Sequence, residues 1–299
     1  MRLPILMYHY VRPNQERLSA KHKVLELSKF TAQIEELQKK YSFITGKYLS
    51  SARDDDFKSK IWLTFDDGYR DCIDHVLPTL LKFGAVGTFY VPTEAVYERK
   101  LLDVNKIHVL LSSGISEIDL LETTKQIFSD LRIDETIGQS FDELYEVNGI
   151  ANAWNNEETE FLKKIFQKLL PIESRKALLD RVFCQIVDRR ESSWVDEFYL
   201  TPDDVRRLTE SGIEIGSHGH SHEWLSEMTA NQQRSDLIKS LSILKSELSG
   251  HVVESVCYPF GSYDSHTLEI LKENEIKTAV VNKIQKFAGS PKMGRICLN

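Results

Sequence analysis

The stretch Ile61-Trp62-Leu63-Thr64-Phe65-Asp66-Asp67-Gly68-Tyr69 carries the clearest structural and chemical signal in the chain. Its apolar half, Ile61 to Phe65, predicts a buried strand that ends in two adjacent carboxylates and a glycine. Carboxylates this close repel each other, which raises at least one pKa unless a cation binds one of them. A metal-binding aspartate beside a general base would resolve that conflict. An ordinary Asp-Gly turn is the alternative, and spacing alone does not decide between them.

The segments around this stretch alternate between strand and helix patterns. Downstream, residues 71–83 predict a helix and residues 85–91 a strand. Upstream, residues 3–7 predict another buried strand, and a helix over 28–40 is expected to take Ser28 as its N-cap. Strand, helix and strand at this spacing indicate a parallel sheet covered by helices.

The same α/β pattern returns near the carboxyl-terminal third of the chain. Thr201-Pro202-Asp203-Asp204 has the N-cap, the first-turn proline and the acidic residue of a capping box, and a second capped helix starts near Thr229. Strands are expected at 214–216, at 253–258 and at 278–281. The first of these strands leads directly into a histidine-rich segment.

Residues 94–199 differ from the rest, because helical periodicity dominates and strand patterns nearly vanish. We predict a single domain, 1–299, with 94–199 as a helical insertion. The insertion could serve as a lid, a specificity lobe, an oligomer contact or a packing layer. Its aromatic residues Tyr145, Trp154 and Trp194 could stack on a sugar, although aromatic residues in helices mostly belong to the core.

Composition excludes several classes of protein. The chain has 299 residues, and its 38 basic and 45 acidic side chains give a net charge of −7, which argues against a nucleic-acid-binding surface. Four dispersed cysteines form no disulfide or zinc-knot pattern. No apolar run reaches the roughly 18 residues that span a bilayer, and the amino terminus lacks a secretory pattern, so we expect a cytoplasmic protein. The oligomeric state does not follow from the sequence.

The second chemical motif is His218-Gly219-His220-Ser221-His222. Three histidines this close, in a chain that has nine, favour metal binding over a solvated loop. On an extended strand all three rings would share one face, whereas in a turn His218 and His222 would converge. Two imidazoles and an oxygen ligand leave positions for water and substrate, which a hydrolytic site requires.

A third motif, Cys257-Tyr258-Pro259-Phe260-Gly261-Ser262-Tyr263, places aromatic residues around a proline and a glycine at a strand end. Taken alone it predicts a plain turn.

Together, Thr-Phe-Asp-Asp-Gly at 64–68, His-x-x-x-His at 218–222 and Tyr-Pro-Phe-Gly at 258–261 resemble the polysaccharide deacetylase family, the carbohydrate esterases with a NodB homology domain. The resemblance covers about residues 1–92 and 201–299. It implies an α/β fold, a distorted (β/α) barrel, and a divalent metal ion, with zinc expected and cobalt, nickel or manganese as alternatives.

The resemblance also implies a role for individual residues. Asp67, His218 and His222 are the expected metal ligands, and Asp66 is the expected general base, which takes a proton from the water that attacks an acetamide carbonyl. A backbone N–H near Phe260 would help the metal to stabilise the oxyanion. The substrate-binding residues are expected to be Tyr69, Pro259 and Phe260.

The chain departs from the usual family pattern in three places. Gly219 replaces a serine or threonine, so another group, with Ser221 as a candidate, must hold the histidine turn. Cys257 replaces the arginine that orients the base. The usual carboxyl-terminal Leu-x-His, which supplies the general acid, is missing, but Leu6-Met7-Tyr8-His9 is similar to that element moved to the amino terminus, as in circularly permuted members that deacetylate biofilm poly-N-acetylglucosamine.

His9 is therefore the expected general acid, and a hydrogen-bonded structural histidine is the alternative. The resulting hypothesis is a metal-dependent hydrolase that removes the N-acetyl group from an N-acetylated sugar or glycan, in surface polysaccharide or lipopolysaccharide biosynthesis. A hydrolase of another amide, such as an N-formyl sugar or a cyclic amide, is one alternative. A catalytically silent glycan-binding protein is another.

Overall fold

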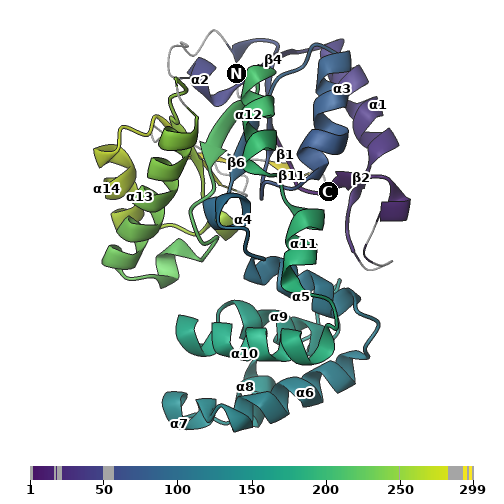
Figure 1. The fold of residues 1–299 in the computed structure, drawn as a ribbon, viewed down its shortest axis with the longest axis vertical. Coiled ribbons are helices and arrows are strands. Elements are labelled where there is room, and N and C mark those ends of the chain that lie inside the picture. The colour runs from purple at the N-terminus through teal and green to yellow at the C-terminus, as the bar shows by residue number, and fades with distance from the viewer. Residues whose placement is uncertain are drawn as a thin grey trace. The chain divides into compact units, whose positions relative to one another are not determined.

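The computed structural model describes residues 3–16, 18, 22–49, 57–248, 250–281, 292–294 and 296–297. The chain divides into two compact units. The first comprises Met1–Arg17, Lys23–Lys100 and Ser192–Asn299, and the second comprises Leu18–His22 and Leu101–Glu191. Figure 1 traces the chain through both units by colour.

A nine-stranded sheet, counted over the described residues, forms the centre of the first unit. All of its strand pairs are parallel, and its order is β10-β9-β8-β7-β6-β5-β1-β11, with β4 also paired to β5. The strands are β1 (Ile5–Tyr8), β4 (Ser42–Ile44), β5 (Lys60–Phe65), β6 (Thr88–Val91), β7 (Glu214–Ser217), β8 (Ser255–Cys257), β9 (Thr278–Val281), β10 (Lys292–Gly294) and β11 (Ile296–Cys297). A separate two-stranded parallel sheet joins β2 (Val11–Arg12) to β3 (Leu25–Glu26).

The last two strands connect the two edges of the sheet. β10 pairs with β9, whereas β11, which begins two residues after β10 ends, pairs with β1. The segment 292–297 therefore lies beside β9 in its first half, β10, and beside β1 in its second half, β11. This arrangement curls the sheet into the distorted (β/α) barrel that the sequence motifs predicted.

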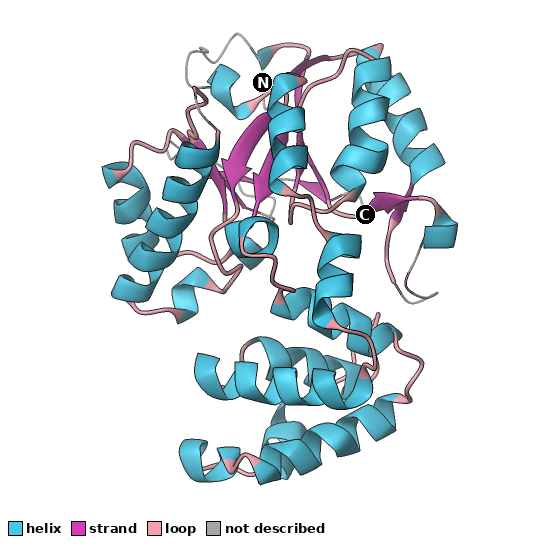
Figure 2. Cartoon of the chain, viewed as in Figure 1, coloured by secondary structure: helices cyan, strands magenta, loops and turns pink. Residues whose placement is uncertain are grey.

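Helices surround this sheet, as the cyan ribbons around the magenta strands show in Figure 2. Large apolar clusters fill the space between strands and helices, and they include Leu6, Leu63 and Val256. The α-helices of this unit are α1 (Leu27–Gln38), α2 (Gly46–Leu49), α3 (Leu77–Lys82), α4 (Thr93–Tyr97), α11 (Glu191–Phe198), α12 (Pro202–Glu210), α13 (Ala230–Glu247) and α14 (Ser265–Glu273). A π-helix, η3 (Cys72–Val76), precedes α3, and η1 (Asn14–Glu16), η4 (Leu225–Glu227) and η5 (Pro259–Gly261) are short 3-10 helices.

A smaller apolar cluster fills the interior of the barrel. Successive strand residues point to opposite faces, so the neighbours of the helix-packed residues point inward. Trp62 is the largest of these side chains, and its indole N–H donates to the Thr88 hydroxyl at 2.8 Å. The cluster consists of Ile5, Ile44, Trp62, Tyr90, Cys257 and Val280. Cys257 therefore faces the barrel interior.

The sequence signals for the helix ends were largely confirmed. Thr201 and Thr229 cap α12 and α13 with complete capping boxes. The expected Ser28 cap was wrong: the N-cap of α1 lies two residues earlier, at Glu26, whose carboxylate accepts the N–H of Ser28 at 2.8 Å. A carboxylate at this position satisfies the same free N–H groups as a serine hydroxyl would.

Over its described residues, the second unit has helices as its regular secondary structure and no strands. Its helices are α5 (Asp103–Ser112), α6 (Glu117–Asp130), α7 (Ile133–Ile137), α8 (Phe141–Asn148), α9 (Glu157–Gln167) and α10 (Ile172–Ile186). Edge-to-face contacts join Phe141 to Phe128 and Phe161 in its core. The helical character expected for 94–199 is present, although α4 and most of α11 belong to the first unit. That the second unit is an insertion into one domain stays a prediction.

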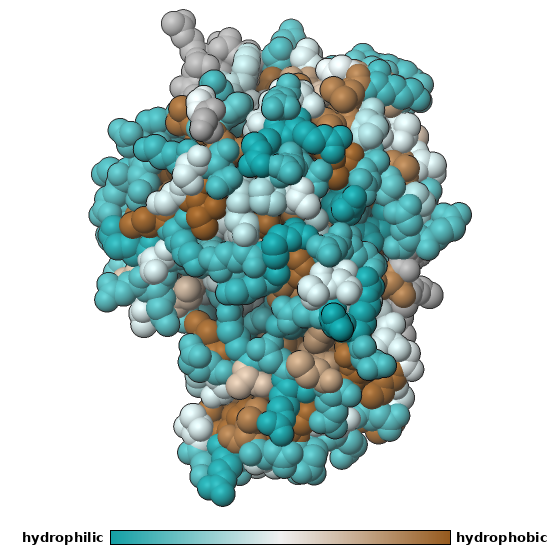
Figure 3. Space-filling view, viewed as in Figure 1, coloured by the Kyte–Doolittle hydropathy of each residue, from teal (hydrophilic) through white to brown (hydrophobic). Residues whose placement is uncertain are grey.

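The three aromatic residues considered as sugar platforms have different environments. Tyr145 packs against Phe161, Trp194 stacks on Phe198, and Trp154 is 77% exposed. Figure 3 shows further hydrophobic side chains at the surface of the helical unit. Within the described ranges, no helix combines the length and the apolar character needed to cross a bilayer.

Gly216 in β7 provides a test of the barrel packing. A Cβ atom there would lie 2.5 Å from Cε1 of Tyr90 and 2.7 Å from Oγ of Ser255. We expect Gly216→Ala to lower the free energy of unfolding by about 1–3 kcal/mol, measured by urea denaturation, because the buried Tyr90 ring must move. The double variant Tyr90→Leu/Gly216→Ala should lose less than the sum of the two single losses. Strictly additive losses would contradict this packing.

Candidate active site

Asp67, His218 and His222 meet at one point, at the carboxyl ends of β5 and β7. Oδ1 of Asp67 lies 3.2 Å from Nε2 of His218 and 3.2 Å from Nε2 of His222. All three residues are buried. His220, the middle histidine, does not face this point. Its Nδ1 atom forms a hydrogen bond with the Thr93 hydroxyl, 2.9 Å away. Of the two geometries that the sequence left open, the structure has the turn, in which the first and third histidines converge.

The donor set fits a divalent metal ion. Nδ1 of His218 lies 2.8 Å from the carbonyl oxygen of Cys257, which only accepts hydrogen bonds, so Nδ1 carries the proton. In the neutral ring, Nε2 then has a lone pair directed at the Asp67 carboxylate. Because both atoms are acceptors, a proton or a cation must lie between them. Ligands about 2.0–2.1 Å from a tetrahedral zinc ion lie roughly 3.3 Å apart. The 3.2 Å separations match that spacing.

The electrostatics agree with a site for a cation. Burial by itself would raise the pKa of Asp67, but hydrogen bonds from His218 and His222 and the nearby charge of His9 hold it well below its usual range. Burial would lower the pKa of His218, yet the contacts with Cys257 and Asp67 hold it well above its usual range. Both shifts favour a negative carboxylate facing positive charge.

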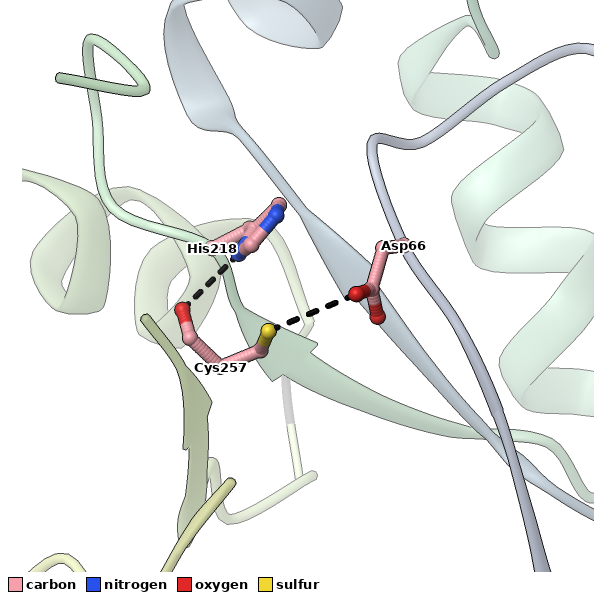
Figure 4. A group of neighbouring side chains, drawn as sticks. All are labelled: Asp66, His218 and Cys257. Carbon is pink, nitrogen blue, oxygen red and sulfur yellow. Dashed lines mark hydrogen bonds between the residues drawn. The ribbon is translucent and has the colours of Figure 1, made fainter. Parts of the chain in front are cut away.

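The second carboxylate, Asp66, is also buried but faces different groups. Its Oδ2 lies 3.8 Å from Nε2 of His9 and accepts a hydrogen bond from the Cys257 thiol, with Sγ 3.5 Å away. Figure 4 shows the sulfur of Cys257 directed toward Asp66 and its carbonyl oxygen directed toward His218. Cys257 thus contacts the expected base from the position that an arginine usually occupies. His9 is 28% exposed, so it is accessible from solvent.

The third motif borders the site through Phe260. The Phe260 ring lies 4.8 Å from that of His222, edge to face, and it also stacks on Trp224 at 4.5 Å with an interplanar angle of 3°. The sequence analysis missed Trp224, although it lies only two residues after His222. Asp67, His222 and Phe260 all have left-handed φ values, of 70°, 57° and 57°. Backbone strain of this kind costs about 1–3 kcal/mol per residue and is typical of functional sites.

The three residues expected to contact the substrate, Tyr69, Pro259 and Phe260, differ in exposure, and their substrate-binding role stays a prediction. Tyr69 is 0% exposed, because it stacks between Tyr10 and Tyr199. Pro259 is also buried and lies against the histidine turn next to Gly219. Their side chains support the loops that carry Asp67 and His218, and of the three residues only Phe260 is partly exposed.

The histidine turn is held by Asp236 of α13, a residue that the sequence analysis missed. Its carboxylate accepts the N–H groups of His220 and Ser221, at 2.8 and 2.9 Å, and the Ser221 hydroxyl at 2.5 Å. Gly219 makes room for it, since a Cβ atom there would lie 3.0 Å from Oδ2 of Asp236. Ser221 participates as expected, but Asp236 is the common acceptor. No sequence motif marks this helical aspartate.

A buried ion pair joins the loops that carry His9 and the two aspartates. Asp71 accepts hydrogen bonds from Nε and Nη2 of Arg12, at 2.9 and 2.5 Å, and from the N–H of Val11 at 2.8 Å. Both partners are nearly inaccessible to solvent. The pair therefore restrains the chain just after His9 against the chain just after Asp67.

Comparison with known proteins decides the family. The sequence model of the polysaccharide deacetylase family matches residues 53–118 and 176–279, which is more than half of the chain. The chain belongs to the polysaccharide deacetylase family. The match contains both aspartates, His218, His222 and Cys257, whereas His9 lies outside it.

Individual members of the deacetylase family resemble the chain to different extents. A peptidoglycan deacetylase of Helicobacter pylori is 31% identical over 75 residues, a quarter of either chain. A Streptococcus pyogenes deacetylase, PplD, solved in complex with acetate, superposes on the whole chain with a TM-score of 0.58 and 17% identity over 92% of its own length. IcaB from Ammonifex degensii also superposes on the whole chain, with a TM-score of 0.57 and 14% identity, over 93% of its own length. At these identities the two structures show the shared fold.

Two glycine substitutions test how the histidine turn is held. Gly219 and Gly212 have φ values of 73° and 82°, but Gly212 has no atom within 4 Å of an added Cβ. Alanine at either position should lose about 1–2 kcal/mol of stability for the left-handed backbone. If Asp67, His218 and His222 hold zinc, only Gly219→Ala should also weaken its binding, by about 10–100-fold, because it displaces the support of these candidate ligands. Equal zinc affinities in calorimetric titrations of the two variants would contradict this role.

Proposed function

We propose that the protein is a metal-dependent hydrolase that removes the N-acetyl group from an N-acetylated sugar or glycan. One observation carries the proposal: a second carboxylate, Asp66, lies beside the Asp67–His218–His222 donor set and has His9 at 3.8 Å. A structural metal site needs no such additional carboxylate. A hydrolytic site needs a base next to its metal and an acid for the leaving group.

Asp67, His218 and His222 would hold the ion, and we propose zinc because carboxylate and imidazole ligands suit it. A bound divalent ion supplies Lewis-acid activation of water and of the substrate carbonyl. The chain's own part is to keep the three donors in place. The Asp236 carboxylate and the Cys257 carbonyl do this for the two histidines.

Asp66 serves as the general base. It accepts one proton from the water molecule that adds to the acetamide carbon. The Cys257 thiol and His9 both face its Oδ2 atom. The backbone N–H of Phe260 is the candidate hydrogen-bond donor to the carbonyl oxygen as it becomes negative.

His9 serves as the general acid. Its imidazolium form donates a proton to the amide nitrogen as the C–N bond breaks, so that acetate and a free sugar amine are released. Its exposure of 28% is compatible with contact with a substrate at the surface. The proton that Asp66 accepted and the one that His9 lost are then exchanged with solvent.

The sugar substrate is inferred from the family and from its members. The chain shares its family with the Helicobacter pylori peptidoglycan deacetylase, and peptidoglycan contains N-acetylated sugars. A role in surface polysaccharide or lipopolysaccharide biosynthesis is a further part of the proposal, and it rests on the resemblance of the sequence motifs to the family.

Metal content and acetate release together test the function. We expect one divalent ion per chain in the wild type and none in His222→Ala, measured by elemental analysis. Asp66→Asn should keep the ion but lower kcat for acetate release from N-acetylglucosamine oligomers by about 10²–10⁴-fold, the size of a general-base contribution.

Other results would favour the other hypotheses. Formate release from N-formyl sugars without acetate release would favour another amide substrate. Glycan binding that persists in metal-free protein, without turnover of any amide, would favour a silent binding protein. A wild type that takes up none of zinc, cobalt, nickel or manganese would contradict the hydrolase mechanism.

The assignment of His9 has its own test. His9→Ala should lower kcat by about 10²–10⁴-fold and change KM little, because proton donation occurs only in the transition state. His75→Ala is a matched control, since His75 also lies near a carboxylate, that of Glu16, but outside the site. Near wild-type kcat in His9→Ala would refute the assignment.

A further inference from the structure

Asp66, His218 and Cys257 form a second group of potential metal donors inside the first unit. One donor atom from each residue lies within 4.8 Å of the other two, and all three residues are buried. They follow or end three different strands, β5, β7 and β8, and Figure 4 shows their side chains gathered at the ends of those strands. The group shares His218 with the Asp67 donor set but adds a sulfur atom.

The spacing of the sulfur and oxygen atoms fits a shared ion. A thiolate lies about 2.3 Å from a tetrahedral zinc-sized ion and a carboxylate oxygen about 2.0–2.2 Å, which places sulfur and oxygen roughly 3.5 Å apart. Sγ of Cys257 and Oδ2 of Asp66 are 3.5 Å apart. The two atoms thus lie close to the separation that a zinc-sized ion bridging them would require.

The two donor sets differ in chemical softness. Asp67, His218 and His222 offer only oxygen and nitrogen, whereas the second group offers a thiolate, which selects thiophilic metals. His218 belongs to both groups, and its Nδ1 carries a proton toward the Cys257 carbonyl. The two sets therefore compete for Nε2 of one imidazole. An ion held by Asp66 would also occupy the carboxylate to which we assigned the general-base role.

We propose that Asp66, His218 and Cys257 form an alternative site for a thiophilic divalent cation, such as cadmium, and that this site is filled in competition with the Asp67–His218–His222 site. On binding, the Cys257 thiol releases its proton to solvent and its sulfur coordinates the ion. Occupation inactivates the protein because Asp66 can no longer accept a proton, and this consequence rests on the proposed function. The binding itself does not.

Cadmium titration of the metal-free protein tests the site without any substrate. We expect one cadmium ion per chain and an ultraviolet thiolate-to-cadmium charge-transfer band that grows with it. Cys257→Ser should lose the band and bind cadmium more weakly by at least about tenfold, since even indirect partners of metal ligands contribute about 10–100-fold. Added zinc should remove the band from the wild type by competition.

The other cysteines provide matched controls. Cys72→Ser removes another buried thiol and Cys184→Ser an exposed one, and both variants, together with Cys297→Ser, should keep the band. Cys257→Ala repeats the test with a second side chain, and unchanged thermal melting of the metal-free variants shows that they fold.

Three results would overturn the proposal: a band that persists in both Cys257 variants, a band that another cysteine carries, or simultaneous binding of one zinc and one cadmium ion per chain. Absence of acetate release in the wild type would contradict the proposed function while leaving this site intact.

Discussion

The parallel direction of the strands is the constraint on which the site depends. Every strand of the sheet runs the same way, so the residues that follow β1, β5, β7 and β8 emerge at one end of the barrel. Residues more than 200 positions apart in the sequence, such as His9 and His218, therefore reach the same group of carboxylates. An antiparallel neighbour in any of these places would send its motif to the opposite end.

Burial of charge is the main cost of this arrangement, and the structure offsets it locally. Asp67 faces two imidazoles, and Asp71 is bound by Arg12. Asp236 accepts three hydrogen bonds, two of them from backbone N–H groups. Each carboxylate also joins two segments that are distant in sequence. The polar groups thereby restrain the loops that carry the site, which is where a parallel barrel has least regular structure.

Two departures from the usual family pattern have structural explanations. Gly219 is accommodated because Asp236 occupies the space beside it and takes over the support of the turn. The Cys257 side chain contacts Asp66 through its thiol, whereas the contact with His218 is made by the backbone carbonyl, which any residue at this position has. A cysteine side chain stands there in place of a cationic one. The electrostatic environment of Asp66 therefore differs from that in family members with arginine at this position.

Local sequence determined much of the fold and the chemical character of the site. The sequence predicted those features that depend on contacts within a few residues. These are the apolar strands at 61–65 and 278–281, the capping boxes at Thr201 and Thr229, and the aspartate and histidine motifs. β4, the barrel-closing strands β10 and β11, and the supporting residues Trp224 and Asp236 were not predicted. Only the tertiary structure decided these, because short strands and single polar side chains acquire their roles from partners far away in the sequence. For the same reason the sequence alone could not show that Tyr69 and Pro259 are covered by neighbours while His9 stays accessible.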